Sequence, residues 1–380
     1  MITVDVHAHV LLPEVEQAVA GQPGLEAHRE LDARRNGPEA LAVSGAMIGE
    51  RIGLLTRAAD RLAAMDAAGV DVQVVSPSPS HYHYWADPGL ARTVWRLANE
   101  GVAAHCASGR PGPASPQRPE PLQGLGVAPS QRPARLQGLG VAPSQRPARL
   151  QGLGVAPSQR PGRLHGLGLA PLQHPSLLVE ALDHALGLGL KGVEISSHAP
   201  GRDLSDPAYE PFWAHAAGTG AVVFLHPFGC TLDERLNRWY LSNLVGHPVE
   251  NAVALSHLIF AGVLDRHPGL KLLAAHGGGY LPYYLGRADH GWRVRPDART
   301  CAREPSSYLR DLHFDSLTHD PAVLRELVRV AGQERVLLGS DFPFDMGDPD
   351  PLAALRAAGL ADTPVRGGNA ARLFDLKDPA

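Results

Sequence analysis

Short apolar runs alternate with amphipathic segments along most of the chain. Most of the eight apolar runs are short and continuous rather than alternating, which is typical of parallel strands covered on both faces. The eight runs span residues 2–6, 70–75, 164–170, 192–195, 221–225, 270–275, 312–315 and 336–339. Segments with helical periodicity lie between them, at 56–68, 91–106, 176–188, 207–218, 252–265, 281–292 and 321–331. This alternation predicts an α/β fold, a (β/α)8 TIM-like barrel that forms a single domain over residues 1–380.

A 14-residue repeat interrupts the pattern before the third predicted strand. The sequence LQGLGVAPSQRPAR begins at Leu122, recurs at Leu136 and returns from Leu150, and a diverged copy begins at Leu164. Only this last copy continues directly into a helical pattern, so we expect it to form the third strand. The upstream copies are interpreted as an insertion within residues 108–163, a Pro-, Gly- and Gln-rich segment predicted to be disordered or loosely packed.

A doubly wound open sheet is the alternative fold. Such sheets often bind dinucleotides through a GxGxxG turn after the first strand. No GxGxxG follows the first strand here, and the repeated GLGVAP lacks that spacing. The barrel is therefore the favoured architecture.

Composition excludes several classes of protein. Apolar residues make up 44% of the 380 residues and charged residues 19%, which argues against a chain that is disordered throughout. The net charge of −4 gives no basic surplus for nucleic acid. Three distant cysteines suggest a reducing compartment, and neither a signal peptide nor an apolar run long enough to span a membrane is recognisable. We therefore expect a cytoplasmic protein with no nucleic-acid or membrane partner.

Histidine and aspartate close several of the predicted strands. The first strand leads into His7 and His9, whose side chains point the same way because they are two residues apart in an extended chain. His226 ends the fifth strand, His276 ends the sixth, and Asp341 follows the eighth. His276 precedes three glycines, which either leave room for a substrate or form a tight strand-to-helix turn.

These residues share one face of the predicted barrel, the face on which active sites of this fold lie. His7, His9, His226 and Asp341 offer the nitrogen and oxygen ligands that Zn²⁺ prefers, with a position left open. His276 then remains as the acid or base of the reaction. By contrast, His247 precedes a proline at a predicted helix end and is not expected in the site.

At these motifs the sequence resembles the amidohydrolase superfamily, in the branch typified by aminocarboxymuconate-semialdehyde decarboxylase. The resemblance rests on DVHAH at the N-terminus, HP after the fifth strand, HGGG after the sixth and GSDFPF after the eighth. It extends to RLAAMDAAGVDVQV from Arg61 and to HGGGYLPYYLGRADHGW from His276. Apart from the repeat, nearly the whole chain is covered.

The resemblance implies one catalytic divalent metal, usually zinc and with manganese as the alternative, held at the four positions above. Catalysis is then assigned to His276 and Asp341. It also implies a homodimer in which Arg287 binds a substrate carboxylate across the interface. Arg51 is the nearest match to a second substrate-binding arginine, and Phe228 stands where the branch has tryptophan.

The implied activity is non-oxidative decarboxylation of a conjugated acid, of the carboxymuconate-semialdehyde or aromatic type. The alternative is a hydrolase acting on a lactone, ester or amide, or a hydratase, because the same metal site serves those reactions. A catalytically inactive interaction protein built around the repeat would be expected to lack ligands, yet all of them are present.

Overall fold

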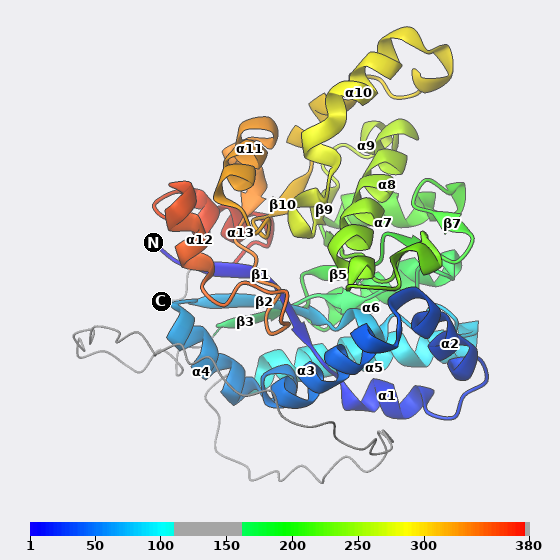
Figure 1. Cartoon of the computed structure of the whole chain (residues 1–380), viewed down its shortest axis with the longest axis vertical. Coiled ribbons are helices and arrows are strands. Elements are labelled where there is room, and N and C mark those ends of the chain that lie inside the picture. Colours follow the sequence, from blue (N-terminus) through cyan, green and yellow to red (C-terminus); the bar gives the residue numbers. More distant parts are fainter. Residues whose placement is uncertain (110–161, 377–380) are drawn as a thin grey trace.

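A parallel β-barrel forms the centre of the computed structural model, which describes residues 1–109 and 162–376 (Figure 1). Within those residues the chain occupies eight barrel positions, one of which is split into two short strands, β3 and β4. The strands are β1 (Val4–Val10), β2 (Val72–Pro77), β3 (Leu164–Gly166), β4 (Gly168–Leu169), β5 (Gly192–Ile195), β8 (Val222–Leu225), β9 (Lys271–Ala274), β10 (His313–Asp315) and β11 (Val336–Leu337). Each overlaps one of the eight predicted apolar runs, and β1 continues beyond its predicted end at residue 6 to Val10.

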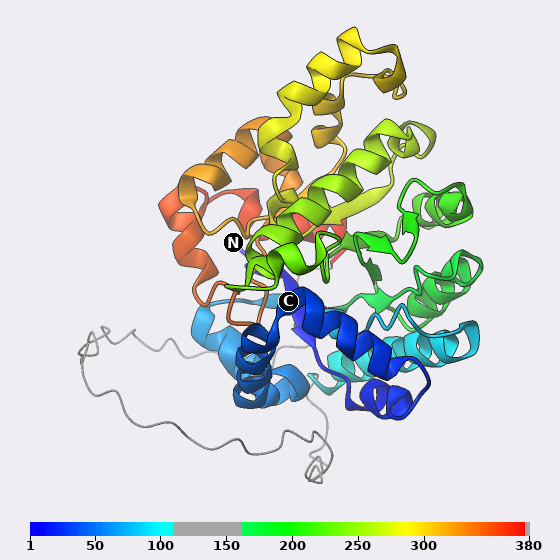
Figure 2. The ribbon, with the colours of Figure 1, turned by 45° about the vertical axis from the view of Figure 1, so that its right-hand side comes forward.

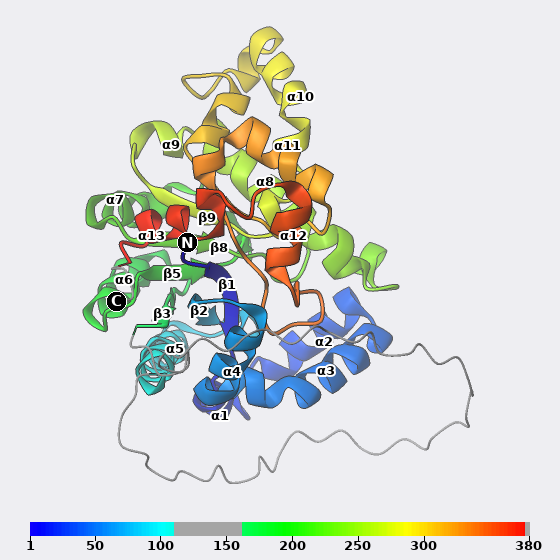
Figure 3. The same ribbon diagram turned by 90° about the vertical axis from the view of Figure 1, so that its left-hand side faces the viewer.

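Hydrogen bonds between the first and last strands close the barrel. One sheet has the order β1-β2-β3 and the other β4-β5-β8-β9-β10-β11, and all their pairings are parallel. The amide of Val6 donates to the carbonyl of Leu338 at 2.9 Å, and that of His9 to Phe342 at 2.7 Å. This seam rules out an open doubly wound sheet and confirms the predicted barrel; Figure 3 looks toward it, with β1 in blue and the C-terminal segments in red.

The helices lie outside the strands, as the view in Figure 2 shows for most of the ring. They are α1 (Pro13–Val19), α2 (Leu25–Asn36), α3 (Pro38–Thr56), α4 (Ala58–Ala68), α5 (Pro88–Ser108), α6 (Leu178–Gly187), α7 (Glu210–Thr219), α8 (His247–Phe260), α9 (Val263–Arg266), α10 (Leu281–Val294), α11 (Pro321–Ala331), α12 (Pro351–Ala358) and α13 (Gly368–Leu373). The helix predicted at 252–265 is two helices, because Gly262 adopts the left-handed conformation between them. No helix among the described residues is long and apolar enough to cross a membrane.

The copy of the repeat that begins at Leu164 does form the third barrel strand. Its first piece pairs with β2 and its second with β5. Gly168 allows α5 to approach closely, because a Cβ at this position would lie 2.5 Å from the side-chain oxygen of Asn99. The upstream copies fall in residues 110–161, outside the described residues, so the predicted insertion stays a prediction.

A bulge in β1 sets the direction of the two histidines. Between Asp5 and Ala8 this strand advances three residues while β2 advances two, from Gln73 to Val75. Before the bulge, Val4 and Val6 point into the barrel, where they join the apolar cluster that includes inward residues of β2 and β8. After the bulge, the odd-numbered residues of β1 point inward instead. As a result His7 and His9 both face the interior at the carboxyl end of the barrel.

Candidate metal centre

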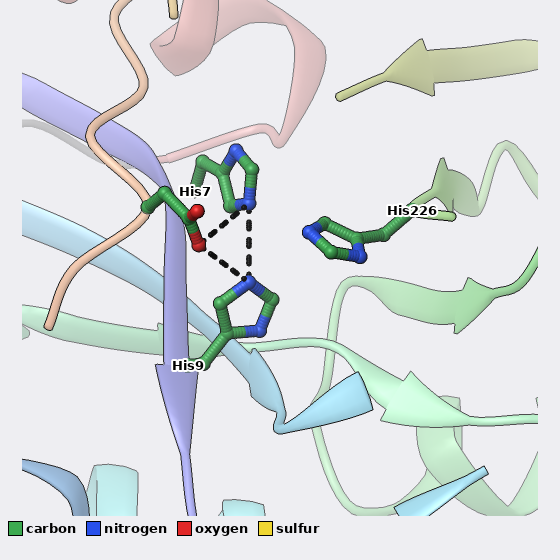
Figure 4. A group of neighbouring side chains, drawn as sticks. His7, His9 and His226 are labelled. Carbon is green, nitrogen blue, oxygen red and sulfur yellow. Dashed lines mark hydrogen bonds and ion pairs between the residues drawn. The ribbon is translucent and has the colours of Figure 1, made fainter. Parts of the chain in front are cut away.

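The four predicted metal ligands converge at the carboxyl ends of the strands. His7 and His9 extend from β1, whereas His226 reaches them from the segment after β8 (Figure 4). Asp341 follows β11, and the ligand atoms of all four residues lie within 4.8 Å of one another. The Nε2 atoms of His7 and His9 are 3.1 Å apart, and each lies 3.2–3.3 Å from Oδ1 of Asp341. The structure thus brings together all four side chains.

The two histidines of β1 turn their Nε2 atoms toward this point. Nδ1 of His7 donates to Oδ2 of Asp315 at 2.6 Å, and Nδ1 of His9 donates to the carbonyl of Pro77 at 3.1 Å. With Nδ1 engaged as the donor, Nε2 is the ring atom that can bind a cation, and the raised pKa of His7 means that a metal would displace a proton from its Nε2. Tetrahedral ligands at about 2.1 Å from a metal are about 3.4 Å from each other, close to the spacing found here.

Unpaired buried atoms also point to a cation. Among the described residues, neither ring nitrogen of His226 has a hydrogen-bond partner, although both atoms are buried. Burial and the neighbouring His9, His276 and His7 hold the pKa of His226 well below its usual value, so its ring is neutral. Buried polar groups are rarely left without partners, and a divalent cation would satisfy this set.

The carboxylates of Asp341 and Asp315 and the ring of His7 shift one another's pKa values. Burial alone would lower the pKa of His7, but the charges of Asp341 and Asp315 outweigh it and raise this pKa to about 10. Burial would likewise raise the pKa of Asp341, yet His7 and the hydrogen bonds of its histidine neighbours hold it well below the usual range. Two anions beside three imidazoles make an environment suited to a cation with two positive charges.

Asp315, which the sequence analysis missed, orients two parts of the centre. Its carboxylate accepts four hydrogen bonds: from Nδ1 of His7, and from the backbone amides of His276 (2.9 Å), Gly277 (2.8 Å) and Leu317 (3.1 Å). It ends β10 as Asp341 follows β11, and that position at the end of an apolar strand is the signal that could have found it. Such carboxylates fix the tautomer and the direction of a metal-binding histidine.

Asp5 of the DVHAH motif has a structural partner rather than a place among the ligands. Its carboxylate accepts from the amide (3.0 Å) and hydroxyl (2.6 Å) of Ser340, and from the amide of Gln73 at 2.8 Å. Arg61 in turn donates to the side chain of Gln73 at 2.7 Å and to the carbonyl of His9. This buried network ties β1 to the segment that carries Asp341.

His276 lies beside the ligand set and borders open space. Its Nε2 is 3.9 Å from Oδ2 of Asp341, and its buried Nδ1 has no hydrogen-bond partner among the described residues. The ring lines two cavities, one of about 410 Å³ against α10 and one of about 240 Å³ against α3, which we call the α10 cavity and the α3 cavity. Asp341 lines both, so a molecule in either cavity lies next to the centre.

The glycines after His276 serve the turn. A Cβ on Gly278 would lie 2.6 Å from the ring of Phe314, and one on Gly279 would lie 2.1 Å from the carbonyl of Pro248. Both residues have positive φ angles, 75° and 65°. The structure supports the tight turn, and Gly279 also lines the α10 cavity beside His276.

The three predicted substrate-binding residues have different surroundings. Phe228 lines the α3 cavity, as expected for a residue that contacts the substrate. Arg51 lines neither cavity, because its guanidinium donates to the backbone carbonyls of Pro343 and Phe344. Arg287 lies on the exposed side of α10 and also lines neither cavity.

His247, which the sequence analysis set aside, lines both cavities. Pro248 does not end a helix here, since His247 and Pro248 are the first residues of α8, where proline is well tolerated. Burial and the adjacent His276 lower the pKa of His247 to about 3, so the ring is neutral.

Comparison with known proteins agrees with these features. The sequence model of the amidohydrolase family matches residues 4–376. The chain belongs to the amidohydrolase family. This amidohydrolase is 30% identical to 2-amino-3-carboxymuconate-6-semialdehyde decarboxylase of Dictyostelium discoideum over 293 residues, which are 77% of this chain and 68% of that protein. The family resemblance inferred from the sequence motifs is therefore confirmed.

Solved structures share the fold of this amidohydrolase. The 5-carboxyvanillate decarboxylase of Sphingomonas paucimobilis has a TM-score of 0.71 at 22% identity, with 99% of both chains covered. A dihydroxybenzoic acid decarboxylase of Polaromonas sp. JS666, crystallised with manganese and the inhibitor 2-nitroresorcinol, has a TM-score of 0.68 at 20% identity, covering 99% of this chain and 97% of that one. At these identities the likeness establishes the fold alone.

Proposed function

We propose that this amidohydrolase is a metal-dependent, non-oxidative decarboxylase of a conjugated carboxylic acid, of the carboxymuconate-semialdehyde or aromatic type. The observation that carries the proposal is the convergence of four ligand side chains beside His276, at a point where two cavities meet. The names of the Dictyostelium relative and of the two solved structures support the reaction class.

His7, His9, His226 and Asp341 would hold one divalent metal. Three nitrogens and one oxygen suit Zn²⁺, and the manganese in the Polaromonas enzyme makes Mn²⁺ the alternative. When bound, the metal supplies a Lewis acid that attracts an oxygen of the substrate and neutralises its charge.

His276 has the position of a proton donor. Decarboxylation breaks the bond between the carboxylate and its carbon, and CO₂ leaves without the bonding electron pair. That pair stays on the carbon, which must gain a proton to give the product. Imidazole is the side chain best suited to this transfer near neutral pH, and Nε2 of His276 lies 3.9 Å from Oδ2 of Asp341.

The test is a screen of the protein loaded separately with zinc and with manganese. Aromatic and unsaturated carboxylic acids are offered in D₂O, and CO₂ and the product mass are measured. We expect CO₂ and one deuterium at the vacated carbon, with both lost in His276→Asn. Opening of lactones, esters or amides, or addition of water to a double bond, without CO₂ from any acid would instead establish the hydrolase or hydratase alternative.

We also propose that the enzyme works as a homodimer in which Arg287 of the partner subunit meets the substrate carboxylate. Of the described residues that line the α10 and α3 cavities, none is an arginine or a lysine. Arg287 shares the exposed side of α10 with Tyr284 (71% exposed) and Val294 (58% exposed). In Figures 1 to 3 this helix and the segment after it extend away from the barrel, which supports contact with a second chain.

A mixing experiment tests the shared site. Arg287→Ala and His276→Asn chains are each expected to have little activity, whereas a mixed dimer contains one site with neither defect. Recovery of up to about a quarter of wild-type activity is expected when equal amounts are unfolded and refolded together. Sedimentation that shows a fully active monomer would contradict the proposal.

The cytoplasmic location is proposed because none of the three cysteines, all among the described residues, forms a disulfide.

A further inference from the structure

His247 is held in a fixed position beside the proton donor. Its ring and that of His276 are nearly parallel, with 17° between their planes and 5.9 Å between their centres. The five residues before it form a π-helical turn, Ser242–Gly246, which leads directly into α8. Such turns are frequent at functional sites. A group bound near His276 would therefore meet the edge of the His247 ring as well.

The hydrogen bond to Asn243 determines which nitrogen of His247 is a donor. The side-chain amide of Asn243 donates to Nδ1 of His247 at 3.3 Å. A neutral imidazole that accepts at Nδ1 carries its proton on Nε2. Within the part of the chain that the structure describes, no hydrogen-bond partner is found for this Nε2–H, and the ring borders both cavities.

The rest of the cavity walls narrows the chemistry that this donor recognises. The α10 cavity is otherwise lined largely by apolar and aromatic side chains, such as Leu317, Val323 and Tyr283. The α3 cavity adds two carboxylates, Asp32 and Asp345, which cannot donate when ionised, and hydroxyl groups such as that of Ser44. A neutral N–H beside apolar walls suits a hydroxyl or carbonyl oxygen on a flat molecule.

We infer that His247 is a specificity-determining residue, whose Nε2–H donates to an oxygen substituent on the substrate carbon next to the one that loses CO₂. The inference rests on the proposed function, because it takes the carbon protonated by His276 as its reference point. His247 and His276 line the same two cavities with their rings stacked, so one bound acid can contact both side chains. Acids with a hydroxyl or carbonyl oxygen beside the scissile carboxylate are then the preferred class.

The test compares two probes and two variants. Binding of 2-hydroxybenzoate and of benzoate to the manganese-loaded protein is measured by calorimetry, which does not depend on turnover. His247→Phe keeps a flat ring against His276 but removes the donor. His247→Gln removes the ring but keeps an N–H donor near the position of Nε2.

One neutral hydrogen bond corresponds to about a 3- to 10-fold change in affinity. We expect His247→Phe to weaken binding of 2-hydroxybenzoate by this factor and to leave benzoate within about twofold, while His247→Gln restores most of the preference. Equal loss for both acids, or no loss in the Phe variant, would overturn the inference and leave the decarboxylase proposal standing. If neither acid binds the wild-type protein, the inference and the proposed aromatic substrate class fail together.

Discussion

Replacing Asp315 by asparagine should weaken metal binding although Asp315 is not itself a ligand. Oδ2 of this fully buried carboxylate accepts from His7 and from the amide of His276, and Oδ1 accepts from the amides of Gly277 and Leu317. Asparagine has the same shape but one oxygen and one NH₂ group. Whichever way the amide is turned, its NH₂ group faces two N–H donors.

The structure allows the size of the effect to be estimated. Burial would raise the pKa of Asp315, but the hydrogen bond and charge of His7 lower it, so the lost group is an anion. Two hydrogen bonds disappear, and each unsatisfied buried donor costs about 1–3 kcal/mol, so we expect roughly 2–6 kcal/mol of lost folding stability. Loss of an orienting carboxylate typically weakens metal affinity about 10- to 100-fold.

Competition with a chromogenic chelator measures the metal affinity, and thermal melting of metal-free and loaded protein measures stability. Asp320→Asn is the matched control, because this exposed residue caps α11 through the amides of Ala322 and Val323, and asparagine caps equally well. If Asp315→Asn folds and binds metal as tightly as wild type, the orienting role assigned to Asp315 is wrong.

Four further predictions concern other parts of the chain. His276→Asn should keep its metal by elemental analysis, yet lose about 10²–10⁴-fold in kcat. His9→Ala should lose stoichiometric metal, and retention of it would remove His9 from the ligand set. Burial alone would raise the pKa of Glu250, but hydrogen bonds from His198 and Thr231 lower it to about 2 from its ordinary 4.5. The stabilisation from ionised Glu250 is thus complete above pH 4.5 and is lost as the pH falls toward 2. The melting temperature of Glu250→Gln should therefore be lower than that of the wild type at pH 7, and the two should converge in acid. Deletion of residues 122–163, which leaves one repeat copy, should change neither melting temperature nor kinetics, and a large loss of either would show that the segment belongs to the working fold.

The sequence was sufficient to predict the barrel and to predict that the four proposed ligands lie together, because both depend on local pattern. A strand covered on both faces needs an uninterrupted apolar run, so the runs stand out, and a polar residue that closes such a run must lie at a strand end. His226 and Asp341 were found in this way. The bulge in β1 was not foreseen, because nothing local distinguishes it from a regular strand.

Residues that act through partners far away in the sequence were missed. His7 and Asp315 are 308 positions apart, and Asp5 and Ser340 are 335 apart, so no spacing rule connects them. His247 was set aside because a proline follows it, yet proline at the start of a helix and proline after its end look alike in sequence.

The position of the centre at the seam of the barrel links metal binding to closure of the fold. Three of the four ligands, His7, His9 and Asp341, come from the two segments that close the ring. These segments are joined by backbone hydrogen bonds and by the bonds of Asp5 to Ser340, across nearly the whole length of the chain. Joining such distant segments has an entropic cost. A metal ion that binds only the joined state would offset this cost, in proportion to the logarithm of the metal concentration. The proposed ligands reach their mutual spacing only when the seam is closed, and so a metal bound there would stabilise the complete barrel rather than any part of it.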